Sequence, residues 1–179
     1  MSLVRDAGDY RLSFARDAAV RSVRADRVIL ALPFTLLRDV DLAHAGFRAR
    51  KLTAIRTLGM GRNTKLQLAF GSRSWRAGGC NGETRLSGSY VTMWEATRAQ
   101  PGEEGILNFL SGGSISYSLL MPRQYTAFHG SEWEPEGRVY FAGEHTSEEA
   151  SGYLNGAVES RVRAARETIA SLAARRRAA

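Results

Sequence analysis

The stretch Gly137-Arg-Val-Tyr-Phe-Ala-Gly-Glu-His-Thr-Ser147, followed by Ser151-Gly-Tyr-Leu-Asn-Gly-Ala-Val-Glu-Ser160, decides the architecture of this 179-residue chain. Its apolar run 139–142 predicts a short strand that stops at Gly143, and a second glycine-containing turn leads into a helix that begins near Ser151. At the start of a helix, free backbone N–H groups and the positive end of the helix dipole point the same way. The stretch therefore predicts a strand, turn and helix N-terminus that bind an anionic or electron-rich ligand at backbone.

The segments on either side of this stretch predict α/β structure. Arg27-Val-Ile-Leu-Ala-Leu-Pro33 is apolar between its terminal arginine and proline, which is typical of a fully buried parallel strand. The last periodic segment, residues 154–174, predicts a helix that packs on the sheet through an apolar stripe, Val158, Val162, Ala165, Ile169 and Leu172. On its polar side we expect Glu159 and Arg163, four residues apart, to interact.

The middle of the chain predicts antiparallel β structure. From Asn63 onward the periodicity changes to two, in residues 65–70, 89–94 and 106–110. Pro101 and Gly102 supply turn residues between the last two segments. An antiparallel β region is therefore expected between two α/β segments.

The composition fits a globular protein, with 44% hydrophobic and 24% charged residues. The formal net charge is +7, but the cations are spread along the chain and no nucleic-acid-binding motif occurs, so we expect no nucleic-acid partner. Cys80 is the only cysteine and the three histidines are scattered, so we expect neither a disulfide within the chain nor a metal site. No segment is apolar for long enough to span a membrane and no signal-peptide pattern is present, so we expect a cytoplasmic protein without a membrane partner.

Taken in order, these motifs resemble the flavin-containing amine oxidases, the family of monoamine, polyamine and L-amino-acid oxidases. The opening stretch is similar to the C-terminal FAD-binding signature of that family nearly residue for residue. Residues 28–33 resemble its strand beneath the flavin, 59–75 its glycine-to-lysine-to-tryptophan strand, and 117–128 the segment that precedes the signature.

The resemblance implies an α/β, two-domain FAD-dependent amine oxidase-like fold that is incomplete in this chain. Residues 1–42 and 121–179 would form part of a doubly wound FAD-binding domain, and residues 43–120 an antiparallel or mixed β substrate domain. Two family features are missing from the sequence: the G-x-G-x-x-G loop that holds the FAD pyrophosphate, and a helical segment after Gly113. We therefore expect a C-terminal portion of an amine oxidase with an internal omission.

The resemblance also implies which residues hold FAD. The backbone of Tyr153, Leu154 and Asn155 would face the pyrimidine edge of the flavin, and Gly152 and Gly156 would let that backbone come close. Gly143 and Glu144 would lie near the ribityl and phosphate part, and Ala31 and Pro33 on the strand beneath the ring. Because Ser116 stands where monoamine oxidases carry the cysteine bonded to flavin, FAD is expected to be held non-covalently.

Three residues carry the catalytic expectations of the resemblance. Lys65 matches the lysine that holds a water molecule against flavin N5; taken alone, it could equally be a solvent-facing residue of an amphipathic strand. Tyr117 and Tyr153 match an aromatic cage through which the substrate amine reaches the flavin, and aromatic faces attract ammonium groups by about 0.5 to 2 kcal/mol.

Two hypotheses about function follow. In the first, the chain is the C-terminal part of an oxidase that transfers hydride from a C–N-bearing carbon of a small amine or amino acid to flavin N5, giving an imine and, with molecular oxygen, hydrogen peroxide. A complementary N-terminal portion or a second copy of the chain would be its partner. In the second, the chain is a non-catalytic remnant that serves as a binding or interaction module.

Overall fold

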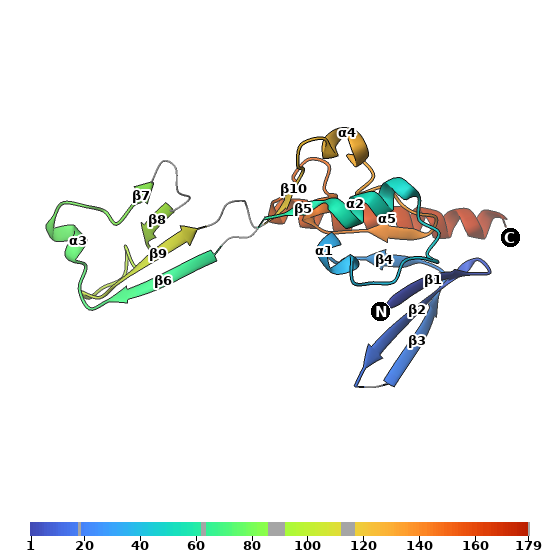
Figure 1. Cartoon of the computed structure of the whole chain (residues 1–179), viewed down its shortest axis with the longest axis horizontal. Coiled ribbons are helices and arrows are strands. Elements are labelled where there is room, and N and C mark those ends of the chain that lie inside the picture. The colour runs from blue at the N-terminus through green and yellow to red at the C-terminus, as the bar shows by residue number, and fades with distance from the viewer. Residues whose placement is uncertain (18, 62–63, 86–91, 112–116, 179) are drawn as a thin grey trace. The chain divides into compact units, whose positions relative to one another are not determined.

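The computed structural model describes residues 1–17, 19–61, 64–85, 92–111 and 117–178 (Figure 1). The chain divides into two compact units, Met1–Met60 with Tyr117–Ala179, and Gly61–Ser116. Sequence reasoning placed the boundaries instead after residues 42 and 120. The difference at the first boundary arises because helix α2 (Ala49–Thr57) buries Ala54 and Ile55 in the core of the first unit.

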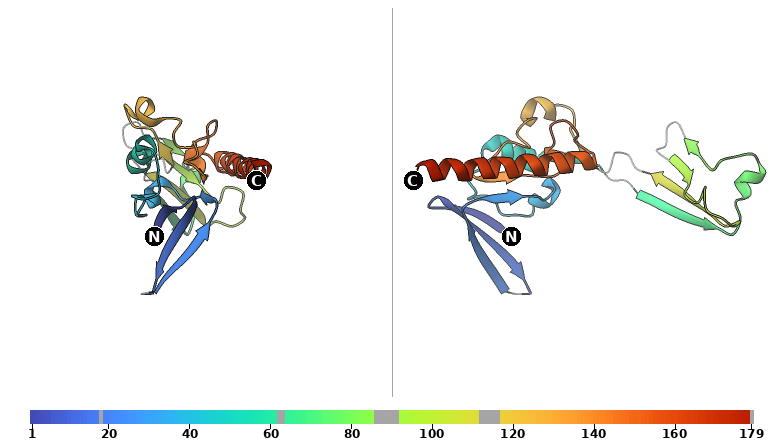
Figure 2. Two further views of the ribbon diagram at one scale, coloured as in Figure 1. Left: turned by 90° about the vertical axis from the view of Figure 1, so that its right-hand side faces the viewer. Right: turned by 180° about the vertical axis from the view of Figure 1, so that it is seen from behind.

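The centre of the first unit is a parallel pair of strands, β4 (Val28–Leu30) and β11 (Val139–Phe141), in which Val28 pairs with Val139. Helices α1 (Phe34–Leu37) and α2 cover one side of the pair, and α5 (Leu154–Ala178) runs along the other (Figures 1 and 2). The predicted parallel strand is therefore present. It is not fully buried, because Ile29 is 45% exposed.

All three residues of strand β11 are buried. Because successive side chains point to opposite faces, both faces of the strand are covered. Val139 and Phe141 face the main core, whereas Tyr140 and Ala142 pack with Ala164 of α5 in a separate small cluster. The main core is formed by large apolar side chains from several elements, among them Leu3, Tyr10, Leu30, Phe34, Leu37, Ile55, Leu58 and Phe128.

The apolar stripe of α5 does not face the sheet, contrary to the sequence prediction. Val158, Val162, Ile169 and Leu172 are 39 to 64% exposed, and Ala165 is exposed as well. The inward face carries the buried small residues Gly156, Ser160 and Ala164, spaced four apart. Ala164 packs against β11, whereas Gly156 lies against the loop before the helix. Small side chains let the helix lie close to the strand, so packing within this chain selected the face with little side-chain volume.

Glu159 and Arg163, which were expected to interact with each other, bond to other partners. Glu159 accepts a short hydrogen bond from Ser147 Oγ. The Arg163 guanidinium donates to the carbonyls of Trp133, Phe141 and Thr146 at 2.9 to 3.1 Å, and pairs with Glu167 at 3.2 Å. The Arg163 guanidinium thus lies among the carbonyls around the turn after β11 and pairs along the helix with Glu167 instead of Glu159.

The remaining elements of the first unit surround this centre. An antiparallel meander of β1 (Ser2–Asp6), β2 (Asp9–Arg16) and β3 (Ala19–Ala25) places Leu3 and Tyr10 in the core. Short strands β5 (Gly59–Met60) and β10 (Ser118–Leu119) pair antiparallel. Helix α4 (Gln124–Phe128) and the 3-10 helix η1 (Glu144–Thr146) complete the unit.

The second unit is an antiparallel sheet, as the sequence predicted. Its strand order is β6 (Thr64–Phe70), β9 (Gly105–Ser111), β8 (Thr92–Glu95) and β7 (Thr84–Arg85), with helix α3 (Ser74–Ala77) beside it. The buried Glu95 carboxylate of β8 accepts hydrogen bonds from Trp75 and Arg76 of α3. Burial alone would raise the pKa of Glu95, but hydrogen bonds from Trp75 and Arg76, together with the charges of Arg76 and Arg73, hold that pKa below its usual value.

Among the described residues, no helix combines the length and the apolar character that crossing a bilayer requires.

Candidate functional site

The candidate site is the turn between β11 and α5, at the carboxyl end of the parallel pair. Gly143 begins the turn with φ of 138°, and a Cβ added there would lie 2.4 Å from His145 Cε1. Its N–H donates to Ser160 Oγ at 3.0 Å, which fixes the turn to the first part of α5. Only glycine fits this position without displacing the His145 ring.

Glu144 joins three segments of the site through its half-buried carboxylate. The Ser118 N–H donates to Oε1 at 3.1 Å, Ser118 Oγ donates to Oε2 at 2.8 Å, and the Gly152 N–H donates to Oε2 at 2.7 Å. Hydrogen bonds to a carboxylate are stronger than those between neutral groups. The glutamate that the resemblance assigned to the ribityl chain thus also holds β10 and the turn before α5 in place.

Tyr117 and Tyr153, predicted as a pair from distant positions, do meet. Their ring centroids are 6.3 Å apart with an angle of 25° between the ring planes. Gly152 lies against the Tyr117 ring, where an added Cβ would be 2.7 Å from Cδ2, and its φ is +87°. Tyr153 is 67% exposed, so its ring is open to a ligand.

The first turn of α5 is open as well. Leu154 is 88% exposed, Asn155 is exposed, and no acidic side chain lies in this turn. The Gly156 and Ala157 amides donate to the Tyr153 carbonyl, which leaves the Leu154 and Asn155 amides of this turn to donate hydrogen bonds to an electron-rich group. The buried Gly156 keeps the turn close to the preceding loop.

The residues predicted beneath the flavin lie at the same edge of the sheet. Ala31 and Pro33 follow β4 and are exposed, and the Pro33 carbonyl accepts hydrogen bonds from the amides of Leu36 and Leu37. The Ala142 amide donates to the Leu30 carbonyl at 3.0 Å, so the ends of β4 and β11 are adjacent. Ligands of parallel sheets commonly bind at this carboxyl edge.

The structure does not test two of the predicted positions. Lys65 lies in the second unit, exposed on β6, with Nζ 5.3 Å from the centre of the Trp94 ring. Its suggested role at flavin N5 therefore stays a prediction. Ser116, on which the expectation of non-covalent FAD rests, lies outside the described residues.

Sequence reasoning missed a buried lysine behind the turn. Lys51 of α2 is 0% exposed; its Nζ donates to the Glu132 carbonyl at 3.0 Å and lies 3.7 Å from the centre of the Phe141 ring. Burial lowers the pKa of Lys51 to about 7. Burial likewise lowers the pKa of His145 to about 4, so this ring is neutral at physiological pH. The one available signal was position, because Lys51 precedes the buried Ile55 by one helical turn.

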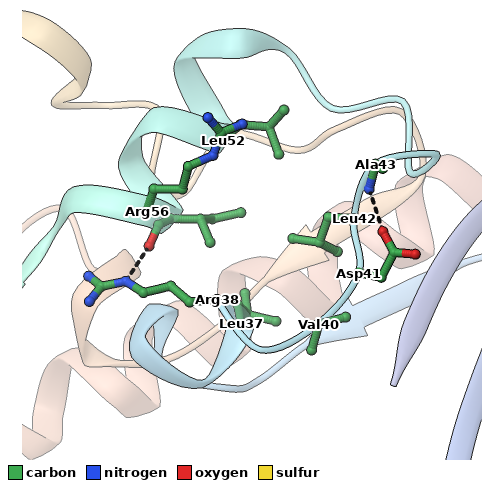
Figure 3. A pocket seen from close by; sticks show the side chains of 9 residues that line it. Leu37, Arg38, Val40, Asp41, Leu42, Ala43, Leu52 and Arg56 are labelled. Atoms are coloured by element: carbon green, nitrogen blue, oxygen red, sulfur yellow. Dashed lines mark hydrogen bonds between the residues drawn. The ribbon is translucent and has the colours of Figure 1, made fainter.

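A pocket lies away from these residues, between α1, α2 and the connecting loop (Figure 3). This pocket has a volume of about 260 Å³. Two of its polar side chains are engaged with backbone: Arg38 Nε donates to the Ile55 carbonyl at 2.9 Å, and Asp41 Oδ1 accepts from the Ala43 amide at 3.0 Å. None of the predicted site residues lines it.

The described ranges contain no group of three or more His, Cys, Asp or Glu side chains that could hold a metal ion. Cys80 is exposed and free.

Comparison with known proteins agrees with the resemblance. The sequence profile of the family "Flavin containing amine oxidoreductase" matches residues 1–115 and 107–169. YobN of Bacillus subtilis (strain 168), provisionally described as an L-amino-acid oxidase, is 32% identical over 202 residues, covering 84% of this chain and 42% of YobN. A flavin-containing amine oxidase of Danio rerio is 51% identical over 62 residues, 35% of this chain and 12% of that protein.

Solved structures show the same fold. Cyclohexylamine oxidase from Brevibacterium oxydans IH-35A superposes with a TM-score of 0.78 at 18% identity, over 96% of this chain and 48% of that chain. Putrescine oxidase bound to putrescine superposes with a TM-score of 0.73 at 15% identity, over 94% of this chain and 47% of that chain. The chain thus spans less than half the length of these proteins, with the incomplete two-domain fold that the sequence predicted. Since the family profile matches most of its residues, the chain belongs to the flavin-containing amine oxidoreductases.

Proposed function

We propose that this chain supplies the flavin-facing C-terminal half of an FAD-dependent amine or amino-acid oxidase. The observation that carries the proposal is the exposed first turn of α5, which lies beside the Tyr117 and Tyr153 rings. Unpaired amides at this turn suit the negative charge that collects on the pyrimidine edge of a reduced flavin. When bound, FAD would accept hydride from the substrate and pass the electrons to molecular oxygen, releasing imine and hydrogen peroxide.

The residues present fit the ring end of a flavin better than its phosphate end. Three of the roughly four acceptor positions of the Glu144 carboxylate are used within the protein, which leaves one for a ribityl hydroxyl. The sequence has no G-x-G-x-x-G loop for the pyrophosphate. The chain's contacts are therefore directed at the ring and the ribityl chain.

Substrate binding would fall to the two tyrosines, between whose faces an amine can be oriented by cation–π attraction. Lys65 is proposed to hold the water molecule at flavin N5. The substrate class is a small amine or amino acid, supported by relatives named as amine oxidases and as an L-amino-acid oxidase.

A second candidate function is that of a non-catalytic remnant acting as an interaction module. The exposed apolar stripe of α5 favours it, because such a face is suited to a partner. If the chain is instead part of an oxidase, a complementary N-terminal portion of that oxidase or a second copy of the chain would occupy the stripe.

Titration of the purified protein with riboflavin and with FAD separates the two functions. A half-site for the ring end binds both with similar affinity, since no phosphate loop distinguishes them, and binding is followed by flavin fluorescence. Tyr153→Ala should weaken binding, whereas Tyr125→Ala, which changes a tyrosine of similar exposure in the same unit, should not. If neither flavin binds, this chain by itself is not an enzyme, and the remnant function is favoured.

The same sample tests non-covalent attachment. After denaturation and filtration, all flavin should pass the filter, and flavin retained with the polypeptide would contradict the expectation that rests on Ser116.

A further inference from the structure

A small cavity lies behind the flavin turn, inside the first unit. Its volume is about 70 Å³. Its walls include the apolar side chains of Leu58, Leu119 and Leu120. Its titratable side chains are His129 and Glu132, from the segment after α4, and His145 from η1, with Glu148 also in the lining.

Three polar atoms of these side chains lack a hydrogen-bond partner although they are buried. They are His129 Nδ1, Glu132 Oε2 and His145 Nε2. Glu132 is 3% exposed and His145 is 5% exposed, so water outside the protein does not satisfy them. The described residues contain two further unpartnered buried atoms, on Arg73 and Arg163, and neither residue lines this cavity.

A buried polar atom without a partner destabilises the folded protein, because its hydrogen bonds with water are lost and not replaced. A water molecule occupies roughly 30 Å³ in the liquid and typically makes two to four hydrogen bonds in a protein interior, so a cavity of this size suits about two molecules. His129 Nδ1 is 3.8 Å from Glu132 Oε1, too far for a direct hydrogen bond, so this carboxyl oxygen does not satisfy the His129 nitrogen.

We propose that this cavity is a built water site, in which bound water joins the Glu132 carboxyl to His129 and His145 and so fixes the segment after α4 to the turn that carries Glu144. The site belongs to this chain alone and does not depend on bound flavin. It would stabilise the segment between η1 and α5, because Ser147, Glu148 and Ser151 also line the cavity.

The charges around the site favour water over a cation. Burial raises the pKa of the Glu132 carboxyl, against the opposing effect of the His129 and Lys51 charges. The Lys51 ammonium group also acts on His145, which faces Glu144. Glu134 and Glu136, with Arg48, surround Lys51 from the other side. The Lys51 charge repels a cation, and the neutral His145 imidazole supplies no charge that would attract one.

Crystals exposed to xenon test whether the cavity holds water. A hydrated polar cavity excludes xenon, whereas a dry apolar cavity binds it. We expect ordered water density within hydrogen-bond distance of Glu132 Oε2 and His145 Nε2, and no xenon there. Xenon at the site, or a monovalent cation that replaces the density, would overturn the proposal.

A matched pair of variants tests the link between the groups in solution. Glu132→Gln removes the ionisable carboxyl group from the site, and Glu134→Gln changes a half-exposed carboxylate two residues away. The protein has only three histidines, so their ring signals can be resolved by NMR. We expect the pH dependence of the His129 signals to change in Glu132→Gln and not in Glu134→Gln, with His44 unchanged in both. Identical His129 behaviour in the two variants would refute a water link; should Glu132→Gln not fold, the xenon experiment on the unmodified protein decides.

Discussion

At the scale of single residues, Lys51 links the stability of the protein to pH. An amine whose pKa is 10.5 in the unfolded chain and about 7 in the folded protein binds fewer protons when folded across that interval. Folding stability therefore rises as the pH increases from about 7 to about 10.5. Below this window both states are protonated, and the full cost of burying the charge is present.

Lys51→Met should remove this rise in stability. Denaturant unfolding at several pH values measures it, and the expected loss is of the order of a few kcal/mol across the window. Lys65 is the only other lysine of the protein and is exposed. Lys65→Met should therefore leave the rise in stability with pH unchanged. An unchanged pH profile in Lys51→Met would show that the ammonium group is solvated in the folded protein.

Several site residues could be predicted from sequence because they belong to one continuous motif. Gly143, Glu144, Gly152 and the first turn of α5 occupy the predicted strand, turn and helix. The water site could not be predicted in this way. Glu132, His129 and His145 come together through the packing of three separate segments, and neither periodicity nor motif spacing carries that information.

At the scale of elements, α5 shows the limit of amphipathicity as a guide. The periodicity correctly predicted a helix, but the apolar stripe pointed to the wrong face. An apolar stripe indicates which side of a helix avoids water in the complete protein, whereas in this chain the buried face of α5 carries small residues at 156, 160 and 164.

Ala164→Leu should therefore destabilise the protein by about 1 to 3 kcal/mol, because Ala164 is fully buried against Tyr140 and Ala142. Ala165→Leu, one residue further on the exposed side, should leave the midpoint of thermal unfolding nearly unchanged. Circular dichroism melting curves of the two variants provide the comparison. Equal destabilisation would mean that both faces of α5 are packed.

At the scale of the whole molecule, the sequence predicted two α/β segments around an antiparallel insertion, and the two units have this arrangement. The first boundary differs from the predicted one because a helix adjoining the insertion packs with the core of the first unit. Chain order alone does not reveal such packing, since α2 could have joined either unit.

The exposed stripe of α5 should make the isolated chain associate. Val162 and Ile169 are 39% and 64% exposed on one helix face. Analytical ultracentrifugation should show association that increases with protein concentration, and the double variant Val162→Glu/Ile169→Glu should reduce it without lowering the unfolding midpoint. Association that persists unchanged in the double variant would locate the contact elsewhere, for example on the exposed apolar side chains of β6.

The parallel pair that supports the flavin turn also has a consequence for folding kinetics. Val28 and Val139 pair although about 110 residues separate them, so closing this contact costs more chain entropy than forming the β1–β2–β3 meander or the inserted sheet. Those local structures should form first, and the β4–β11 pairing should follow. The turn that presents Glu144 and the start of α5 would then be among the last parts of the protein to become ordered, and the newly made chain would acquire its ligand-binding edge only after the complete segment up to β11 has been synthesised.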